Sequence, residues 1–261
     1  MIFDTHCHLN DEALYPRIDE VFANAIKVNV GFFVCVGWDK ESSKLAVKIA
    51  EKYPNVYAAV GFHPCNIENV TENDYEETME LLNHPKVVAL GEIGLDYHWV
   101  KDESKRFKQK EWFIRQINTA NHYKKPILIH NRDAFEDCLE ILKKETPLYR
   151  GIMHCYSGSV ETIKQVTDLG LLIGLGGPLT FTNAKTPKAV CENVPLDKLV
   201  FETDSPYLAP HPLRGTVNEP GNICWVVDEA ARVRSMSKKH LIDTTTKNAL
   251  NLFGIKYEEN N

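Results

Sequence analysis

The feature that most constrains the fold is a regular alternation of short apolar runs with longer amphipathic segments. Strands that are apolar throughout and separated by helices are typical of a parallel sheet covered on both faces. Eight such strand–helix units predict an α/β fold, a (β/α)8 TIM barrel, with an open doubly wound sheet as the alternative. The expected strands are residues 2–6, 31–36, 56–60, 87–91, 126–130, 151–154, 171–175 and 199–203.

The segments between these runs have helical periodicity. In the first of them, apolar residues recur at the i, i+3, i+4 and i+7 spacing of the inner face of a helix: Leu14, Ile18, Val21, Phe22, Ala25 and Ile26. No linker or low-complexity tract interrupts the chain, so we expect a single domain over residues 1–261. The other expected helices are 42–52, 74–82, 105–123, 134–144, 160–169, 184–192, 223–234 and 238–252.

Composition narrows the class of protein. The seven cysteines are scattered without a C-x-x-C pair, which argues against a disulfide framework or a cysteine zinc site. The chain opens without the pattern of a signal peptide, and no apolar run approaches the roughly 20 residues of a membrane helix. We therefore expect a cytoplasmic protein with reduced thiols, no membrane contact and no obligate protein partner.

The net charge of −6 argues against a protein that coats nucleic acid non-specifically, because such proteins are usually basic. It does not exclude a nuclease, since bound divalent cations and a few local basic residues can attract phosphate.

His6 and His8 lie two residues apart at the end of the first expected strand. Residues i and i+2 of a strand point the same way, so both rings can bind one cation. Asp4 falls on the same side and is a candidate for supporting them. A polar strand end that carries two histidines by chance is the alternative, and the other strand ends decide between the two.

Those other strand ends carry more imidazoles and carboxylates. In a barrel the C-terminal ends of the strands converge on the face where active sites are built. Imidazole and carboxylate groups are the usual ligands of divalent metals in such sites. The predicted metal ligands are His6, His8, Glu92, His130, His154 and Asp204.

Two carboxylates are candidates for catalysis. Glu92 lies among glycines after an apolar run, where a charge costs several kcal/mol unless it is paired or metal-bound. It can bridge two cations or, alternatively, form a salt bridge. Asp204 can bind a metal and accept a proton, or simply cap the turn before Pro206. Glu202, on the same side, is a candidate for orienting a ligand.

For each of the remaining polar residues, the sequence allows two roles. His63 either contacts a substrate phosphate or supports the ligands, and Arg214 either binds phosphate or is a solvated loop residue. A basic run from Lys101 to Lys110 forms either a rim near Glu92 or an ordinary solvated helix face. Cys7 and Cys155 follow histidines, so strand alternation predicts that they pack beneath the helices rather than act as nucleophiles.

Six short motifs stand at the ends of the expected strands: DTHCHL at 4–9, GFHP at 61–64, GEIGLDY at 91–97, PILIH at 126–130, HCYSG at 154–158 and ETDSPYL at 202–208. Taken together, these motifs resemble those of the TatD family of metal-dependent deoxyribonucleases. The resemblance runs nearly end to end and in the same order, and the segments 214–215 and 218–220 are similar to the family's late loop.

The resemblance implies an amidohydrolase-like barrel that holds two metal ions and hydrolyses DNA phosphodiesters, often from an end. By similarity, one metal is held by His6, His8, Glu92 and Asp204, and the other by Glu92, His130 and His154. Ends or single-stranded regions of DNA are the expected substrate.

The metal and the substrate stay open at this point. The family resemblance implies magnesium-supported activity, whereas a four-histidine site suits Zn, Mn, Fe or Ni better. The ligand set also permits an amidohydrolase that cleaves a small ester, lactone or amide. A non-catalytic binding module on the same barrel would require a missing ligand, and none is missing.

Overall fold

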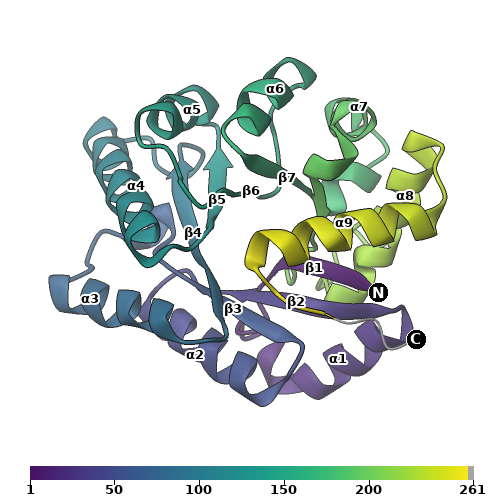
Figure 1. The fold of residues 1–261 in the computed structure, drawn as a ribbon, viewed down its shortest axis with the longest axis horizontal. Helices are drawn as coiled ribbons and strands as arrows, with labels where there is room; N and C mark the ends of the chain where they lie inside the picture. The colour runs from purple at the N-terminus through teal and green to yellow at the C-terminus, as the bar shows by residue number, and fades with distance from the viewer. Residues whose placement is uncertain (258–261) are drawn as a thin grey trace.

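A computed structural model of the chain describes residues 1–257 and confirms the predicted (β/α)8 barrel (Figure 1). One eight-stranded parallel sheet has its strands in sequence order. Each neighbouring pair from β1–β2 to β7–β8 is parallel. The strands are β1 (Ile2–Cys7), β2 (Val30–Val36), β3 (Val56–Val60), β4 (Val87–Asp96), β5 (Ile127–Arg132), β6 (Gly151–Met153), β7 (Leu171–Leu175) and β8 (Leu199–Phe201).

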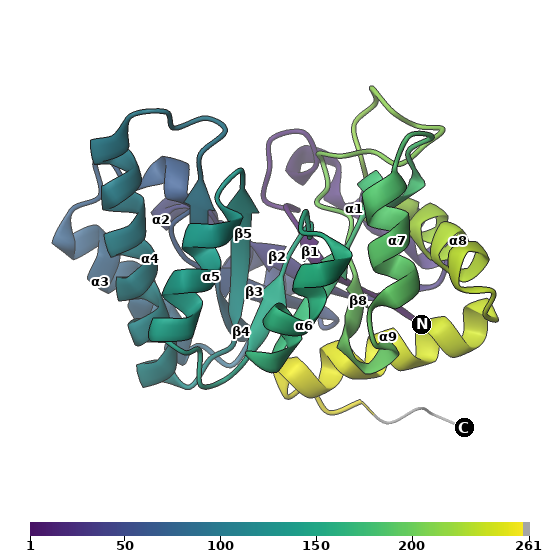
Figure 2. The ribbon, with the colours of Figure 1, turned by 90° about the horizontal axis from the view of Figure 1, so that it is seen from above.

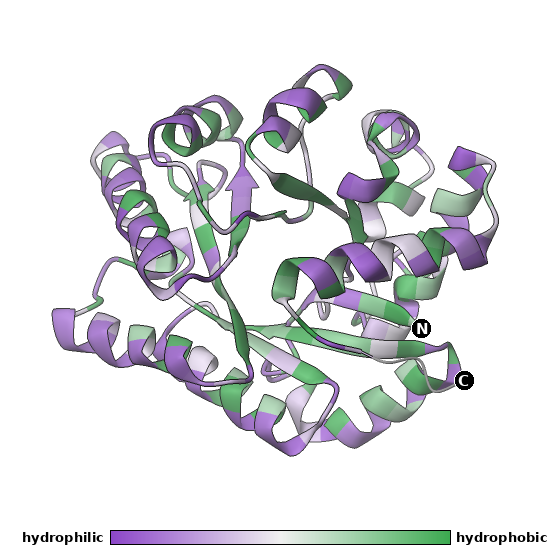
Figure 3. Cartoon of the chain, viewed as in Figure 1, coloured by the Kyte–Doolittle hydropathy of each residue, from purple (hydrophilic) through white to green (hydrophobic). Residues whose placement is uncertain are grey.

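Helices surround the sheet, apolar toward the strands and polar toward solvent (Figure 3). The outer helices are α1 (Ile18–Lys27), α2 (Lys40–Lys52), α3 (Glu72–Glu80), α4 (Glu103–Tyr123), α5 (Phe135–Lys144), α6 (Val160–Asp168), α7 (Lys185–Asn193) and α8 (Ile223–Arg234). Short 3-10 turns join several elements: η1 (Tyr15–Arg17), η2 (Pro64–Asn66), η3 (Leu81–Asn83), η4 (Gly177–Thr180), η5 (Leu196–Lys198) and η6 (Pro220–Asn222). None of the helices within residues 1–257 combines the length and the apolar character that a membrane crossing requires.

Two apolar cores hold the layers together. The larger one fills the space between the sheet and the helices. The smaller one lies inside the barrel and includes Phe3, Val34, Leu128 and Val200. Burying apolar surface on both faces of the strands supplies the main driving force for this architecture.

The last helix, α9 (Lys238–Phe253), covers the N-terminal end of the barrel. Figure 2 shows it at the opposite end from the long loops that follow β4 and β8. Phe253 packs into the inner core, and Thr246 donates to the carbonyl of Met1 at 2.9 Å. Because α9 closes this end, the C-terminal ends of the strands are the end left for a site.

The barrel closes between β8 and β1 through side chains and the residues that follow β8. Thr5 Oγ1 donates to the carbonyl of Phe201 at 3.0 Å, and the backbone N–H of Asp204 donates to the carbonyl of His6 at 2.9 Å. The two ends of the chain therefore meet at one seam, and that seam lies beside His6.

Three local expectations about the elements are wrong. Strand β4 extends to Asp96 instead of ending at residue 91, because Ile93, Gly94 and Asp96 pair with β5. Leu14 precedes α1, which begins at Ile18 after a 3-10 turn containing Pro16. Ile26 is exposed rather than part of the inner face of that helix.

Candidate metal centre

Glu92 lies at the centre of a polar cluster at the C-terminal end of the barrel. Its Oε1 atom is 2.6 Å from Nδ1 of His130 and 2.8 Å from Nε2 of His154. Its Oε2 atom is 3.5 Å from Nε2 of His6 and 3.8 Å from Nε2 of His8. Burial alone would raise the pKa of this carboxyl, but His154 and His130 hold it well below its usual range.

Asp204 reaches the same cluster from the segment after β8. Its Oδ1 atom lies 3.4 Å from Nε2 of His8 and 3.7 Å from Nε2 of His6. Its φ of 55° lies in the left-handed region, which aspartate tolerates better than most residues. Its pKa is lowered because the hydrogen bond to His8 and the charge of His154 outweigh burial. Asp204 is therefore a carboxylate, and its side chain remains 15% exposed.

Three histidines each have one ring nitrogen next to an acceptor outside the cluster. Nδ1 of His8 is 3.0 Å from the carbonyl of Val36. In the same way, Nε2 of His130 is 3.1 Å from Oδ2 of Asp96. Nδ1 of His154 is 3.4 Å from Oε1 of Glu202, an ion-pair separation without a hydrogen bond within residues 1–257. An acceptor that holds one ring N–H directs the lone pair of the other nitrogen into the cluster, which is the arrangement of metal-binding imidazoles.

The inward-facing nitrogens of His130 and His154 lie 2.6 and 2.8 Å from Oε1 of Glu92. At these distances a nitrogen lone pair and a carboxylate oxygen repel each other unless a positive charge lies between them. A proton can supply that charge. Burial would lower the pKa of His154 and His130, but the charge on Glu92 raises both. A divalent cation satisfies the same electrostatic demand, so protons and metal compete for these nitrogens.

His6 provides the clearest test of whether these residues fit a metal. It is fully buried, and neither ring nitrogen has a hydrogen-bond partner within residues 1–257. Its ring stacks on that of His154 with centroids 3.9 Å apart, and burial and that neighbour lower its pKa. An unpartnered buried polar group costs about 1–3 kcal/mol, and a metal bond would remove that cost. The donor set therefore fits a metal.

The described residues contain three groups whose ligand atoms lie within 4.8 Å of one another. They are His6, His8 and Glu92; His63, Glu92 and His130; and His6, His154 and Glu202. The structure thus brings together all six residues that the sequence predicts as ligands, together with His63 and Glu202.

His63 differs from the other histidines in the direction of its hydrogen bond. It precedes η2, and its Nδ1 accepts the backbone N–H of Cys65 at 3.1 Å. Neutral His63 must therefore carry its proton on Nε2, which lies 3.9 Å from Oε1 of Glu92. Burial lowers its pKa to about 3, so the ring is a neutral donor that faces the cluster.

Glu202 and Asp4 both support the site from inside the barrel wall. Glu202 is fully buried, and its Oε1 accepts the backbone N–H of Cys155 at 2.5 Å. The carboxyl group of Asp4 makes no hydrogen bond or ion pair with an imidazole within residues 1–257: it accepts from the backbone N–H and the hydroxyl of Thr203 at 3.0 and 2.6 Å. Asp4 therefore fastens β1 to the segment after β8.

The two cysteines that follow histidines differ in their surroundings. Cys7 packs behind the sheet as expected, with Sγ 3.4 Å from the carbonyl of Val34. The expectation for Cys155 is wrong, because β6 ends at Met153 and Cys155 lies in a turn with φ 43°. Burial raises the pKa of its thiol to about 12, so Cys155 stays protonated and is unsuited to act as a nucleophile.

Two of the five cations in the basic run from Lys101 to Lys110 have acidic partners on other elements. Lys105 pairs with Glu68 at 2.9 Å, and Lys110 pairs with Asp137 at 2.7 Å. The interpretation as an ordinary helix face is therefore the better one. Arg214 lies in the loop after β8, 4.2 Å from the centroid of the Phe181 ring, and its side chain makes no ion pair within residues 1–257.

Sequence reasoning passed over Asp96. Its carboxylate is buried and joins Nε2 of His130 to the backbone N–H of Trp99, at 3.1 and 2.9 Å. The available signal was strand alternation, since Glu92 and Asp96 are four residues apart and share a face of an extended strand.

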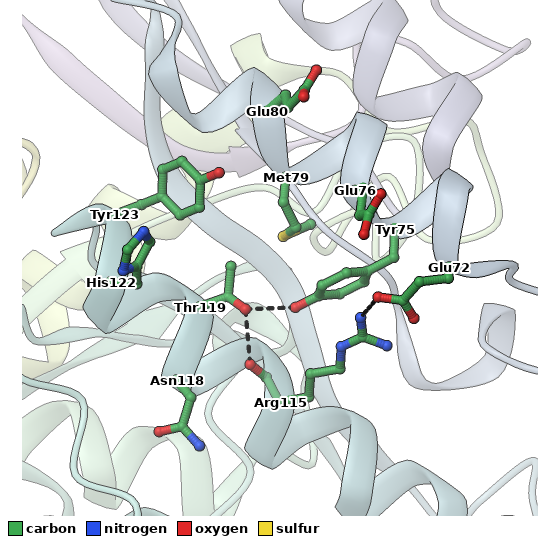
Figure 4. Close-up of a pocket in the computed structure, with 10 residues that line it drawn as sticks. All are labelled: Glu72, Tyr75, Glu76, Met79, Glu80, Arg115, Asn118, Thr119, His122 and Tyr123. Carbon is green, nitrogen blue, oxygen red and sulfur yellow. Dashed lines mark hydrogen bonds and ion pairs between the residues drawn. The ribbon is translucent and has the colours of Figure 1, made fainter.

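A groove of about 600 Å³ lies elsewhere, on the outside of the barrel between α3 and α4 (Figure 4). In it, Arg115 pairs with Glu72 and lies 3.7 Å from the centroid of the Tyr75 ring. None of the residues that line this groove belongs to the cluster around Glu92.

A family model described as TatD related DNase matches residues 3–254. The chain belongs to the TatD family. A metal-dependent hydrolase of Bacillus subtilis named YabD is 44% identical over 98% of this chain and 100% of its own length. The crystal structure of YJJV, a TatD homolog from Escherichia coli K12, superimposes with a TM-score of 0.93 at 27% identity and covers 98% of each chain.

Family membership makes the chain a metal-dependent hydrolase and agrees with the cluster around Glu92. A third similarity, to a solved structure of lower sequence identity, is evidence for the fold only. The crystal structure of an amidohydrolase from Saccharomyces cerevisiae has a TM-score of 0.82 at 19% identity and covers 97% of this chain and 99% of its own.

Proposed function

We propose that this TatD-family hydrolase is a deoxyribonuclease that cleaves phosphodiester bonds of DNA at ends or in single-stranded regions. The observation that carries the proposal is the position of Glu92. One oxygen faces His130 and His154 while the other faces His6 and His8, which is the arrangement expected of a carboxylate that bridges two cations. Two-cation sites are typical of phosphodiester hydrolysis.

The proposal assigns two divalent ions, Mg, Mn or Zn, to the cluster. His6, His8, Glu92 and Asp204 would hold one, and Glu92, His130 and His154 would hold the other. Bound ions supply Lewis acidity and lower the pKa of water toward about 7. The assignment is supported by the unpartnered ring of His6 and by the acceptors behind His8, His130 and His154.

The protein's own groups would then have distinct roles. Asp204 is a partly exposed carboxylate with a lowered pKa, so it can accept the proton of the attacking water. The Nε2–H of His63 can donate to a phosphate oxygen. Asp96 and Glu202 orient His130 and His154. Arg214, which has no acidic partner among residues 1–257, can pair with a phosphate of the bound strand.

The competing function is hydrolysis of a small ester, lactone or amide, which the same ligands permit. The description of the matching family and the unpaired cation Arg214 favour DNA.

We also propose that residues 1–261 form one domain. The proposal is supported by the bonds of α9 to both sides of the barrel seam: Thr246 donates to the carbonyl of Met1 before β1, and Asn248 donates to the carbonyl of Leu196 before β8.

The test uses end-labelled single- and double-stranded DNA with protein loaded with Mg, Mn or Zn. Asp204→Asn should lose at least about 100-fold in rate because it removes the proton acceptor. Asp197→Asn, an exposed carboxylate in η5 at the other end of β8, is the matched control and should cleave normally. Equal cleavage by native protein and Asp204→Asn would contradict the mechanism. Failure of the native protein with all three metals would favour a small-molecule substrate.

A further inference from the structure

An exposed tryptophan, Trp99, is linked through the carboxylate of Asp96 to the candidate metal ligand His130. The loop after β4 lies at the end of the barrel opposite α9 (Figure 2). Trp99 belongs to this loop and is 69% exposed. Its backbone N–H donates to Oδ1 of Asp96 at 2.9 Å, and Oδ2 of the same carboxylate is 3.1 Å from Nε2 of His130. The backbone at Trp99, from which the indole projects, is therefore held by the carboxylate that contacts the candidate ligand His130.

Arg132, a cation with no acidic partner among residues 1–257, lies beside the indole of Trp99. The guanidinium of Arg132 is 5.6 Å from the centroid of the Trp99 ring. Arg132 ends β5, two residues after His130, and its exposed side chain makes no hydrogen bond or ion pair within residues 1–257. By contrast, Lys105 and Lys110 on the neighbouring helix α4 are both paired with carboxylates.

These features match the chemistry of a nucleotide rather than that of an apolar partner. A single exposed aromatic residue needs no explanation by itself. Here, however, a flat ring and an unpaired guanidinium occur together beside a site suited to phosphate chemistry. Proteins that bind single strands combine such aromatic platforms with cations that contact the backbone.

We propose that Trp99 and Arg132 form a nucleobase subsite. The base next to the scissile phosphate stacks on the Trp99 ring, and Arg132 pairs with a neighbouring phosphate. This inference rests on the proposed deoxyribonuclease function and adds a specificity-determining site to it. Because the faces of a paired base are covered by its neighbours in the duplex, the subsite selects an unpaired base, as in a single strand or a frayed end.

The first test measures binding of a fluorescein-labelled single-stranded oligonucleotide with phosphorothioate linkages that resist cleavage. Trp99→Ala should raise the Kd by about 5- to 100-fold, the usual effect of losing one base–aromatic stack. Trp99→Phe should stay close to the native value because it keeps an aromatic face. Trp225→Ala, which removes a 43% exposed tryptophan from α8, is the matched control and should bind normally.

The second test removes the base instead of the ring. An oligonucleotide with an abasic position next to the scissile linkage should bind the native protein as weakly as the intact strand binds Trp99→Ala. The abasic oligonucleotide should bind Trp99→Ala about as weakly as it binds the native protein. Arg132→Gln should reduce the slope of log Kd against log salt by about 0.7, the value for one phosphate contact on a single strand.

The outcomes separate this proposal from the one on which it rests. If the native protein cuts DNA but Trp99→Ala binds the intact strand equally well, the subsite is overturned and the deoxyribonuclease stands. A native protein that neither binds nor cuts DNA would overturn both. Sedimentation of the native protein as a dimer that Trp99→Ala converts to a monomer would assign the indole to a subunit interface and overturn the subsite. Metal content, measured for each variant, should remain at the native value.

Discussion

Nε2 of His130 lies 3.1 Å from Oδ2 of Asp96, a buried carboxylate that stands outside the ring of candidate ligands. This contact fixes the orientation of the imidazole whose other nitrogen faces Glu92 at 2.6 Å. A carboxylate behind a ligating histidine orients the ring and raises its basicity. Asp96 should therefore affect metal binding without touching the metal.

The first prediction concerns the variant Asp96→Asn. The amide keeps the size of the side chain but removes the charge behind His130, so metal affinity should fall about 10- to 100-fold. Competition with a chromophoric chelator measures this affinity directly. Asp133→Asn, an exposed carboxylate paired with His98 in the next loop, is the control and should bind metal normally. Equal affinities for the two variants would contradict a positioning role for Asp96.

The second prediction separates His63 from the metal ligands. His63→Phe keeps a planar ring but removes the Nε2–H donor, so kcat/KM on DNA should fall about 10- to 1,000-fold. Metal content should not change, because Nε2 of His63 carries a hydrogen rather than a free lone pair. Atomic absorption of the purified variant checks this point. A variant that loses metal and activity together would place His63 among the ligands.

The pKa of His63 gives this prediction a second measurement. Burial lowers that pKa to about 3, so the ring is neutral between about pH 5 and 8. The pH–rate profiles of native protein and His63→Phe should therefore have the same shape between about pH 5 and 8. An acidic limb that disappears in the variant would show that His63 titrates during turnover.

Much of the site could be predicted because a parallel barrel converts sequence order into spatial order. Each candidate ligand follows an apolar run, and the C-terminal ends of those runs must meet on one face. His6 and Asp204 come from opposite ends of the chain yet share a contact of 3.7 Å for that reason. Composition and periodicity sufficed for this step because they determine which face of each strand is buried.

The features that were missed depend on interactions between elements. Strand β4 continues past Glu92 because β5 offers it hydrogen-bond partners as far as Arg132, and a single strand's sequence does not reveal its neighbour's length. The lysines of α4 stayed open between a basic rim and a solvated helix face, because the partners of Lys105 and Lys110 lie on other segments. The distance from Asp96 to His130 likewise appears only when both strands are placed.

The third prediction tests the packing behind His154. A methyl group on Gly174 in β7 would lie 2.6 Å from Oε2 of Glu202 and 3.2 Å from Cγ2 of Ile152. Gly174→Ala must therefore displace Glu202, and overpacking of this kind costs about 1–3 kcal/mol of unfolding free energy. Urea unfolding in the presence of EDTA measures that cost without a contribution from metal.

Gly221→Ala is the control for this prediction, since its added methyl group would meet nothing closer than 3.4 Å. It should leave the free energy of unfolding within about 0.5 kcal/mol of the native value. Because Glu202 supports His154, Gly174→Ala should also weaken metal binding. Native stability for Gly174→Ala would mean that the sheet shifts to accommodate the methyl group at no cost.

The last prediction concerns the pH dependence of stability at the barrel seam, where burial raises the pKa of Asp4 to about 8. In the unfolded chain this carboxyl titrates near 3.9, so between these values the folded state holds a proton that the unfolded state has lost. The stability that Asp4 contributes is fully present below about pH 4 and is lost as the pH rises through 8. Asp4→Asn cannot ionise, yet its amide oxygen can still accept from Thr203. In EDTA, unfolding free energies measured from pH 5 to 9 should therefore fall more steeply for the native protein than for Asp4→Asn. Parallel curves for the two proteins would mean that Asp4 is already ionised in the folded barrel.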